Sequence, residues 1–103
     1  MSDVTLIELI NRRLGNVPEL LEVEIHRTDL EAYIRDAVAD MRGSGVPSSL
    51  LPSDPDTNNY NDEAATCIFC YVAAYFGTDR GLTNRYLTLY RNKVFRLTLD
   101  EEE

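Results

Sequence analysis

The chain has 103 residues, 44% of them hydrophobic, which is enough for one folded domain with a modest core and argues against global disorder. The 18 acidic and 10 basic residues give a formal net charge of -8. This charge argues against a dedicated nucleic-acid binder, because such proteins present a net basic surface.

The first predicted element is a helix over about residues 3–14. Ser2 or Asp3 is expected to cap it, because both side chains accept hydrogen bonds from free backbone N–H groups. Gly15 follows where a left-handed C-terminal cap is favoured. The apolar positions recur at helical spacing, at Leu6, Ile7, Ile10 and Leu14.

A break is predicted at residues 16–18, after which Pro18 is placed to open a short helical turn over Glu19–Glu22. Leu21, Val23 and Ile25 then alternate with acidic residues, the period of two that is typical of a strand. A lone strand has no obvious partner, so we expect an extended or irregular linker as far as Arg27.

The second helix is predicted over about residues 28–42. Thr28 and Glu31 have the spacing of a capping box, in which each side chain bonds the other's backbone N–H. Gly43 follows at the end. One apolar stripe runs through Leu30, Ile34, Ala37, Val38 and Met41.

Residues 43–61 form a long polar segment that contains three prolines and two glycines, so regular structure is not expected. Loops of this length in a small domain are usually functional or mobile. Leu50, Leu51 and Tyr60 are its apolar side chains, and we expect them to contact the domain or a partner.

A third helix is predicted over residues 62–76, with Asp62 as its cap, Glu63 in its first turn and Gly77 after its end. Within it, AATCIFCYVAAYF has Thr66 as its only clearly polar residue. A helix that is apolar on every side must be surrounded. This segment is therefore the expected centre of the domain.

The fourth helix is predicted over residues 82–97, and residues 98–103 are expected to fray as an acidic tail. Its expected inner positions are Leu82, Tyr86, Leu89, Tyr90 and Val94. The predicted fold is thus all-α: one domain over residues 1–103, with four helices and a long polar loop between the second and the third.

Charge is segregated near the C-terminal end. Residues 79–97 contain five basic residues against Asp79 alone, whereas residues 98–103 contain four acidic residues and no basic one. Three interpretations stay open for this block: contact with DNA phosphates, salt bridges to a neighbouring copy, or a solvated face paired internally with Asp79, Asp62 or Glu63. Nine of the ten basic residues are arginine, which favours use at an interface. The arginines concerned are Arg80, Arg85, Arg91 and Arg96.

Cys67 and Cys70 form a C-x-x-C pattern, which suits a thiol redox pair or half of a zinc site. The pair lies in mid-helix among apolar residues, and His26 is the only histidine. We therefore interpret both cysteines as small buried side chains. Two cysteines and no recognisable signal peptide also lead us to expect a reducing compartment, the cytoplasm.

No other constellation predicts chemistry. His26 has no evident nucleophile or acid partner. Residues 54–59 slightly resemble a calcium loop through Asp54, Asp56, Asn58 and Asn59, but they lack its glycine and its terminal glutamate. No catalytic residue, no cofactor and no metal site is predicted.

Tyr71, Tyr75, Tyr86 and Tyr90 are spaced four apart in pairs on two consecutive predicted helices. Such a ladder is either a binding surface or the seam between two antiparallel helices, with the hydroxyl groups at its edge. The seam is favoured.

At these last two helices the sequence resembles the C-terminal half of the small head–tail connector proteins of tailed bacteriophages, also called head-completion or adaptor proteins. The matching run is DEAATCIFCYVAAYFGTDRGLTNRYLTLYRNKVFRLTL. It has an alanine-rich apolar helix that ends in Tyr75 and Phe76, a short polar turn with Asp79, and a helix with Arg85-Tyr86 and Tyr90. The order of the parts and the chain length also agree.

This resemblance implies an all-helical, non-enzymatic protein that forms a ring, expected to be twelve-fold, on the portal at the head–tail junction of the virion. Such rings extend the DNA channel and dock a stopper or tail component. The implied partners are other copies of the chain, the portal protein, a stopper or tail-completion protein, and genomic DNA that passes without specific binding. No membrane is implied, and assembly would occur in the host cytoplasm.

The candidate interface residues are Leu50, Leu51, Tyr60, Tyr71, Tyr75, Arg80, Arg85, Tyr86, Arg91 and Arg96. The main alternative is a small helical DNA-binding or regulatory module that uses the arginine-rich fourth helix. A thiol enzyme or metal protein built on Cys67 and Cys70 is a third hypothesis.

Overall fold

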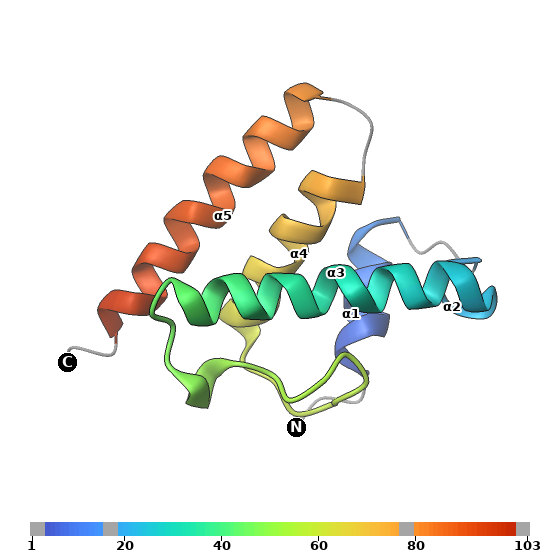
Figure 1. Cartoon of the computed structure of the whole chain (residues 1–103), viewed down its shortest axis with the longest axis horizontal. Helices are drawn as coiled ribbons and strands as arrows, with labels where there is room; N and C mark the ends of the chain where they lie inside the picture. Colours follow the sequence, from blue (N-terminus) through green and yellow to red (C-terminus); the bar gives the residue numbers. More distant parts are fainter. Residues whose placement is uncertain (1–3, 16–18, 77–79, 101–103) are drawn as a thin grey trace.

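Helices account for most of the residues that the computed structural model describes, 4–15, 19–76 and 80–100, and none of these residues lies in a strand. The all-α prediction is confirmed, and the described ranges contain four helices of at least two turns and one single-turn helix, α2. In chain order (Figure 1) the elements are α1 (Leu6–Arg13), α2 (Glu19–Glu22), α3 (Glu24–Gly43), the 3-10 turn η1 (Ser48–Leu50), α4 (Asp62–Phe76) and α5 (Arg80–Asp100).

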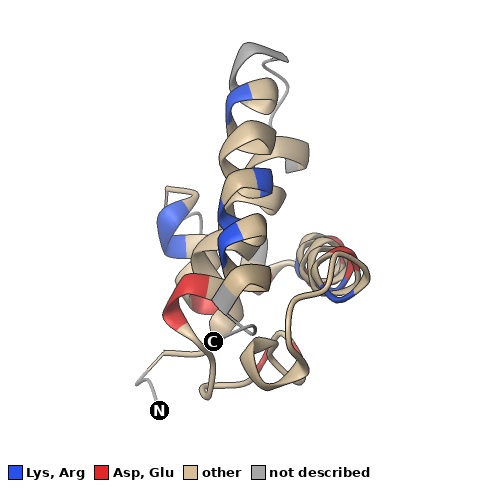
Figure 2. Ribbon diagram, turned by 90° about the vertical axis from the view of Figure 1, so that its left-hand side faces the viewer, with Lys and Arg blue, Asp and Glu red and all other residues tan. Residues whose placement is uncertain are grey.

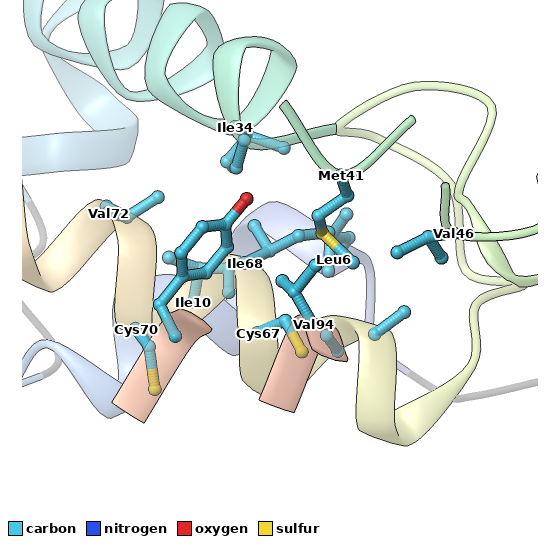
Figure 3. Packing of buried hydrophobic residues seen from close by; sticks show 14 of the residues in the cluster. Leu6, Ile10, Ile34, Met41, Val46, Cys67, Ile68, Cys70, Val72 and Val94 are labelled. Carbon is cyan, nitrogen blue, oxygen red and sulfur yellow. The ribbon is translucent and has the colours of Figure 1, made fainter. Parts of the chain in front are cut away.

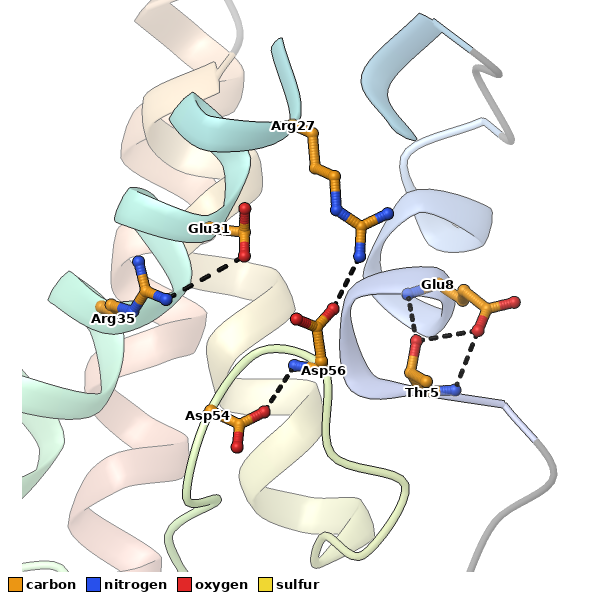
Figure 4. A network of polar contacts seen from close by, with 7 residues as sticks. All are labelled: Thr5, Glu8, Arg27, Glu31, Arg35, Asp54 and Asp56. Carbon is orange, nitrogen blue, oxygen red and sulfur yellow. Dashed lines mark hydrogen bonds and ion pairs between the residues drawn. The ribbon is translucent and has the colours of Figure 1, made fainter. Parts of the chain in front are cut away.

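The capping residue of α1 is Thr5, so the predicted cap at Ser2 or Asp3 is wrong. The Thr5 hydroxyl accepts a hydrogen bond from the Glu8 backbone N–H at 3.3 Å, and the Glu8 carboxylate accepts one from the Thr5 backbone N–H at 3.4 Å (Figure 4). This capping box supplies an acceptor for one free N–H of the first turn. The hydrogen bond from the Thr5 side chain also lowers the pKa of Glu8.

The long loop supplies two further caps for α1. The backbone N–H of Leu6 donates to the Thr57 carbonyl, and that of Ile7 donates to the Pro55 carbonyl, both at 2.9 Å. The first N–H groups of a helix have no partner inside the helix, so they need acceptors from elsewhere. The loop is therefore bound to the start of α1 instead of standing away from the domain.

The helix α3 begins at Glu24, so the predicted linker through Arg27 and the predicted Thr28 capping box are wrong. Val23 has the extended backbone of an N-cap, and its carbonyl accepts the Arg27 N–H at 3.0 Å. Ile25 is 66% exposed, so the strand-like alternation does not mark a buried face. Without a sheet to join, these residues satisfy their backbone groups by extending α3 by one turn.

As predicted, α4 (Asp62–Phe76) lies at the centre of the core, with α1, α3 and α5 packed around it (Figures 1 and 3). Asn61 caps it instead of Asp62, because the Asn61 side-chain oxygen accepts the Ala64 N–H at 3.0 Å. The buried side chains of α4 are Ala64, Ala65, Cys67, Ile68, Cys70, Val72 and Ala74.

The helix α5 runs from Arg80 to Asp100 and is longer than predicted at both ends. Residues 98–100 are helical, which corrects part of the predicted acidic tail, and residues 101–103 lie outside the described part of the chain. Tyr90 and Val94 are buried as predicted and Tyr86 is half-buried, but Leu89 is 42% exposed, so its inner assignment is wrong. The inner face instead continues to Leu97, because this spacing follows one side of a helix and leaves position 89 off it. Leu82 was also expected on the inner face, but its side chain is not among those that the structure describes.

The molecule is thin, with principal extents of 42 × 33 × 19 Å. In Figure 1, α3 crosses α4 on one side, while α5 runs back along α4 at the edge of the molecule. Among the described helices, α5 packs extensively against α4 alone. Much of its circumference is therefore exposed.

Asn11 is the one polar side chain in the described core, 2% exposed on α1, and its Oδ1 atom has no hydrogen-bond partner there. Burying an unsatisfied polar group is unfavourable, so Asn11→Leu should raise the free energy of unfolding by about 1 kcal/mol. Urea denaturation measures this change. Asn11→Asp should lower the free energy of unfolding, and a destabilised Asn11→Leu variant would contradict the assignment of an unsatisfied oxygen.

Candidate interaction surface

The tyrosine ladder is a seam between α4 and α5 that is open at one edge. The rings of Tyr71 and Tyr90 meet edge to face with centroids 5.3 Å apart, and Tyr86 meets Phe69 in the same way at 5.8 Å. The Tyr75 ring contacts the Tyr71 ring at a tilt of 49°, with centroids 4.8 Å apart, but Tyr75 is 48% exposed. Three of the four predicted tyrosines thus contribute to packing, whereas Tyr75 presents an aromatic surface to solvent.

The seam is connected to α3 by a short hydrogen bond. The Tyr90 hydroxyl donates to the Asp40 carboxylate at 2.6 Å. Burial and this hydrogen bond raise the pKa of Tyr90. Burial is also the largest cause of the raised pKa of Tyr71, and Tyr75 and the carboxylates of Asp36 and Asp40 add to it. Negative charge therefore lies close to the aromatic rings.

A groove of about 410 Å³ lies between the C-terminal part of α3 and the two helices of the seam. Asp40 borders it from α3, Tyr71 and Tyr75 from α4, and Arg91 and Phe95 from α5. The groove combines a carboxylate, aromatic faces and one cation at its rim. Such a surface suits a partner that carries both apolar and cationic side chains.

The predicted arginines of α5 are exposed at three of four positions: Arg85, Arg91 and Arg96. Arg80 begins the helix, and its side chain lies outside the description. Neither these three arginines nor Lys93 forms an ion pair with any described residue. Internal pairing with Asp62 or Glu63, one of the three interpretations left open, is therefore absent for these four side chains, and Asp79 lies outside the described residues. Figure 2 shows basic positions recurring along α5, with the acidic start of α4 beneath them.

The apolar residues of the loop contact the domain itself. Leu50 and Leu51 are half-buried against the core, and the Tyr60 hydroxyl donates to the Val4 carbonyl at 3.0 Å. Arg27 of α3 forms an ion pair with Asp56 at 2.6 Å (Figure 4). These contacts hold the loop on the domain, so Leu50, Leu51 and Tyr60 offer less free surface than the sequence suggested.

Cys67 and Cys70 are both buried and free, in agreement with their interpretation as core residues (Figure 3). Burial raises the pKa of Cys67 from about 9 to about 11, and it also raises that of Cys70. A thiol becomes nucleophilic when it ionises, so burial makes both side chains poorly reactive at neutral pH. His26 is exposed on α3, far from both in sequence.

These shifts predict a loss of stability at alkaline pH. In the unfolded chain the Cys67 thiol ionises near its ordinary pKa, so its contribution to stability is complete below about pH 9 and is lost as pH rises towards about 11. Urea denaturation at pH 8, 9 and 10 should show this decline in the free energy of unfolding, and a Cys67→Ala variant should lose less stability over the same range.

A disulfide reagent should label the thiols of Cys67 and Cys70 only after unfolding, and rapid labelling of the native protein at pH 8 would contradict their burial.

Polar side chains at residues 54–59 form short-range hydrogen bonds that stabilise turns within the loop. The Asp54 carboxylate accepts a hydrogen bond from the Asp56 N–H at 2.8 Å, and Thr57 bonds Asn59 in a similar turn. Among the described residues, no group of three or more His, Cys, Asp or Glu side chains is placed to hold a metal ion.

Two exposed apolar side chains of α5 were not identified as surface residues from the sequence. Phe95 is 61% exposed and Leu99 46% exposed, both on α5. Once the inner positions of α5 are set by Tyr90 and Val94, helical spacing places Phe95 on the outer side, so a stricter use of the 3.6-residue period would have found it.

No known protein family, curated protein or solved structure matches the chain. Within the described residues, no helix is both long and apolar enough to cross a membrane.

Proposed function

We propose that this chain is a structural head–tail connector protein of a tailed bacteriophage or prophage, and not an enzyme. Several copies would form a ring on the portal at the head–tail junction, extend the DNA channel and dock a stopper or tail component. The proposal begins from the resemblance of residues 62–99 to the C-terminal half of such proteins.

The observation that carries the proposal is the position of α5 at the edge of a thin domain. This helix packs against α4, and its remaining surface carries unpaired arginines together with Leu89, Phe95 and Leu99. Exposed charges and large apolar side chains on one rigid helix are typical of a surface that another protein covers. A subunit that assembles with its neighbours accounts for this surface.

The net charge of -8 suits a channel protein. Carboxylates that face a channel repel phosphates, so DNA would pass through the ring without binding to it. Portal and stopper would contact the two ends of the ring.

Interrupting the reading frame in its phage or prophage genome tests this function. The expected result is DNA-filled heads and separate tails, which electron microscopy distinguishes from whole particles. Expression of the wild-type chain in trans should restore tailed, infectious particles. Normal yields of such particles from the interrupted genome would contradict the proposed function. Portal and capsid genes upstream of this gene, with tail genes downstream, would support it.

A DNA-binding or regulatory module is the second candidate, supported by the unpaired Arg85, Arg91 and Arg96. It predicts filter retention of DNA at low salt, a steep salt dependence, and loss of binding in Arg85→Ala and Arg91→Ala variants. Absence of binding at low salt would eliminate it. We favour the connector, because Arg91 and Arg96 lie on different flanks of α5. The arginines therefore do not form one continuous basic surface for a DNA backbone.

A further inference from the structure

Two helices of this chain carry stripes of opposite charge with the same spacing. On α3, Asp29, Asp36 and Asp40 are exposed at positions i, i+7 and i+11. On α5, Arg85 and Arg96 are exposed at positions i and i+11. Residues with these spacings lie on one face of an α-helix. We call these faces the acidic stripe and the basic stripe.

The intermediate positions of the two stripes also correspond. The acidic stripe has the half-buried Tyr33 at i+4, where the basic stripe has the exposed Leu89. At i+7, Asp36 of the acidic stripe corresponds to Asn92 of the basic stripe. Each stripe spans about 16 Å along its helix. Placed side by side in the same direction, the stripes match two carboxylates with two arginines, a carboxylate with an amide, and an aromatic ring with a leucine.

Within one chain the two stripes face different sides of the molecule. Arg96 borders a pocket together with Glu63 and Thr66, on the flank of α5 towards the start of α4. Asp40 borders the groove on the other flank of α5, where it bonds Tyr90. The stripes of one molecule therefore cannot meet, whereas the basic stripe of one copy can meet the acidic stripe of the next.

The charges on both stripes have no ion-pair partner among the described residues, although the Asp40 carboxylate accepts the hydrogen bond of the Tyr90 hydroxyl. Asp29, Asp36, Arg85 and Arg96 form no ion pair with any described residue. Arg91 reaches the rim of the groove beside Asp40, but it too forms no ion pair there.

The surroundings of the acidic stripe also suit arginine. Tyr75, 48% exposed, contacts the tilted ring of Tyr71 beside Asp36 and Asp40, so an incoming guanidinium group would find carboxylates and aromatic rings together. Arginine binds both groups well through its planar fork and its flat face.

We propose that the basic stripe of α5 (Arg85, Leu89, Asn92 and Arg96) docks along the acidic stripe of α3 (Asp29, Tyr33, Asp36 and Asp40) of a second copy of this chain. This inference rests on the proposed connector function and identifies the surfaces that would join its subunits. The contact is heterologous, because each copy uses one stripe to its left and the other to its right. A heterologous contact generates a ring when the rotation between copies closes.

Charge reversal tests the pairing in the full-length protein by sedimentation velocity at low salt. The wild type should form an oligomer that dissociates as salt is raised, since salt screens exposed ion pairs. Arg85→Glu with Asn92→Glu makes the basic stripe acidic where it faces Asp29 and Asp36, and Asp29→Arg with Asp36→Arg makes the acidic stripe basic at the same two positions. Each double variant should self-associate about 100-fold more weakly or not at all, because like charges then meet.

An equimolar mixture of the two double variants should recover the wild-type oligomer, because each variant presents the charges that the other lacks. The control is Arg35→Glu with Arg42→Glu, which adds negative charge on another side of α3 and should associate as the wild type does. Circular dichroism should show unchanged helix content in every variant. All the altered side chains are exposed.

The pairing is overturned if either double variant associates as strongly as the wild type, if the mixture stays dissociated, or if the wild type is a monomer at low salt. These outcomes are distinct from failure of the connector function. A wild-type ring that ignores charge reversal would refute the stripes alone. Normal tailed particles from the interrupted genome would refute the function, even if the stripes pair as described.

Discussion

Replacing Ile68 with alanine should lower the free energy of unfolding by about 3 kcal/mol. Ile68 is fully buried at the middle of α4, the helix against which α1, α3 and α5 all pack (Figure 3). Truncation removes its transfer free energy and leaves a cavity that the surrounding helices fill only in part. A domain of this size has a total stability of about 5–15 kcal/mol, so this loss is a large fraction of it.

Ile25→Ala is the matched control, because it removes the same atoms from a side chain that is 66% exposed on α3. Its expected effect on the monomer is within about 0.5 kcal/mol. Urea denaturation of both variants at high salt, which screens charges between copies, measures the difference. Equal destabilisation by the two substitutions would contradict the central position of α4.

Replacing Pro55 with glycine should lower the free energy of unfolding by about 3 kcal/mol, which is unusual for a loop substitution. Pro55 is fully buried, and its carbonyl accepts the Ile7 N–H of α1. Glycine removes the buried ring atoms and also gives the unfolded chain more freedom. The loop carbonyl groups that accept hydrogen bonds from the first N–H groups of α1 are then held less firmly in place.

Pro47→Gly makes the same chemical change in the same loop, at a residue that is half-buried before η1. The gain in unfolded-chain freedom is common to both variants, so the difference between them reports burial. We expect about 1 kcal/mol for Pro47→Gly. Equal losses, or a Pro55→Gly variant as stable as the wild type, would show that the loop does not support α1.

The helical fold could be predicted because several segments carry unambiguous patterns. The all-round apolarity of residues 64–76 placed α4 at the centre, and the apolar stripe through Leu30, Ile34 and Met41 identified most of α3. Both patterns reflect burial, which is the main stabilising effect in a small domain.

The boundaries were harder to predict because capping depends on neighbours as well as on residue type. Thr5 and Glu8 have the same capping-box spacing as Thr28 and Glu31, yet only the first pair caps a helix. The second pair lies inside α3 because the chain is already helical from Glu24, and extending a helix is easier than starting one.

The candidate surface could be predicted only in part. The sequence identified the tyrosines and the arginines, but it could not show that Tyr90 bonds Asp40 or that Tyr75 is exposed. Those facts depend on how α3 crosses the α4–α5 pair, and no local pattern encodes that crossing. Tyr60 was a candidate interface residue, but its hydroxyl donates a hydrogen bond within the domain.

Native mass spectrometry of the wild-type chain, alone and with its portal ring, shows directly whether this domain is a ring-forming subunit. We expect a single closed oligomer with one fixed number of copies at low ionic strength, and the same oligomer bound to the portal. A monomer as the only species in both samples would contradict this expectation.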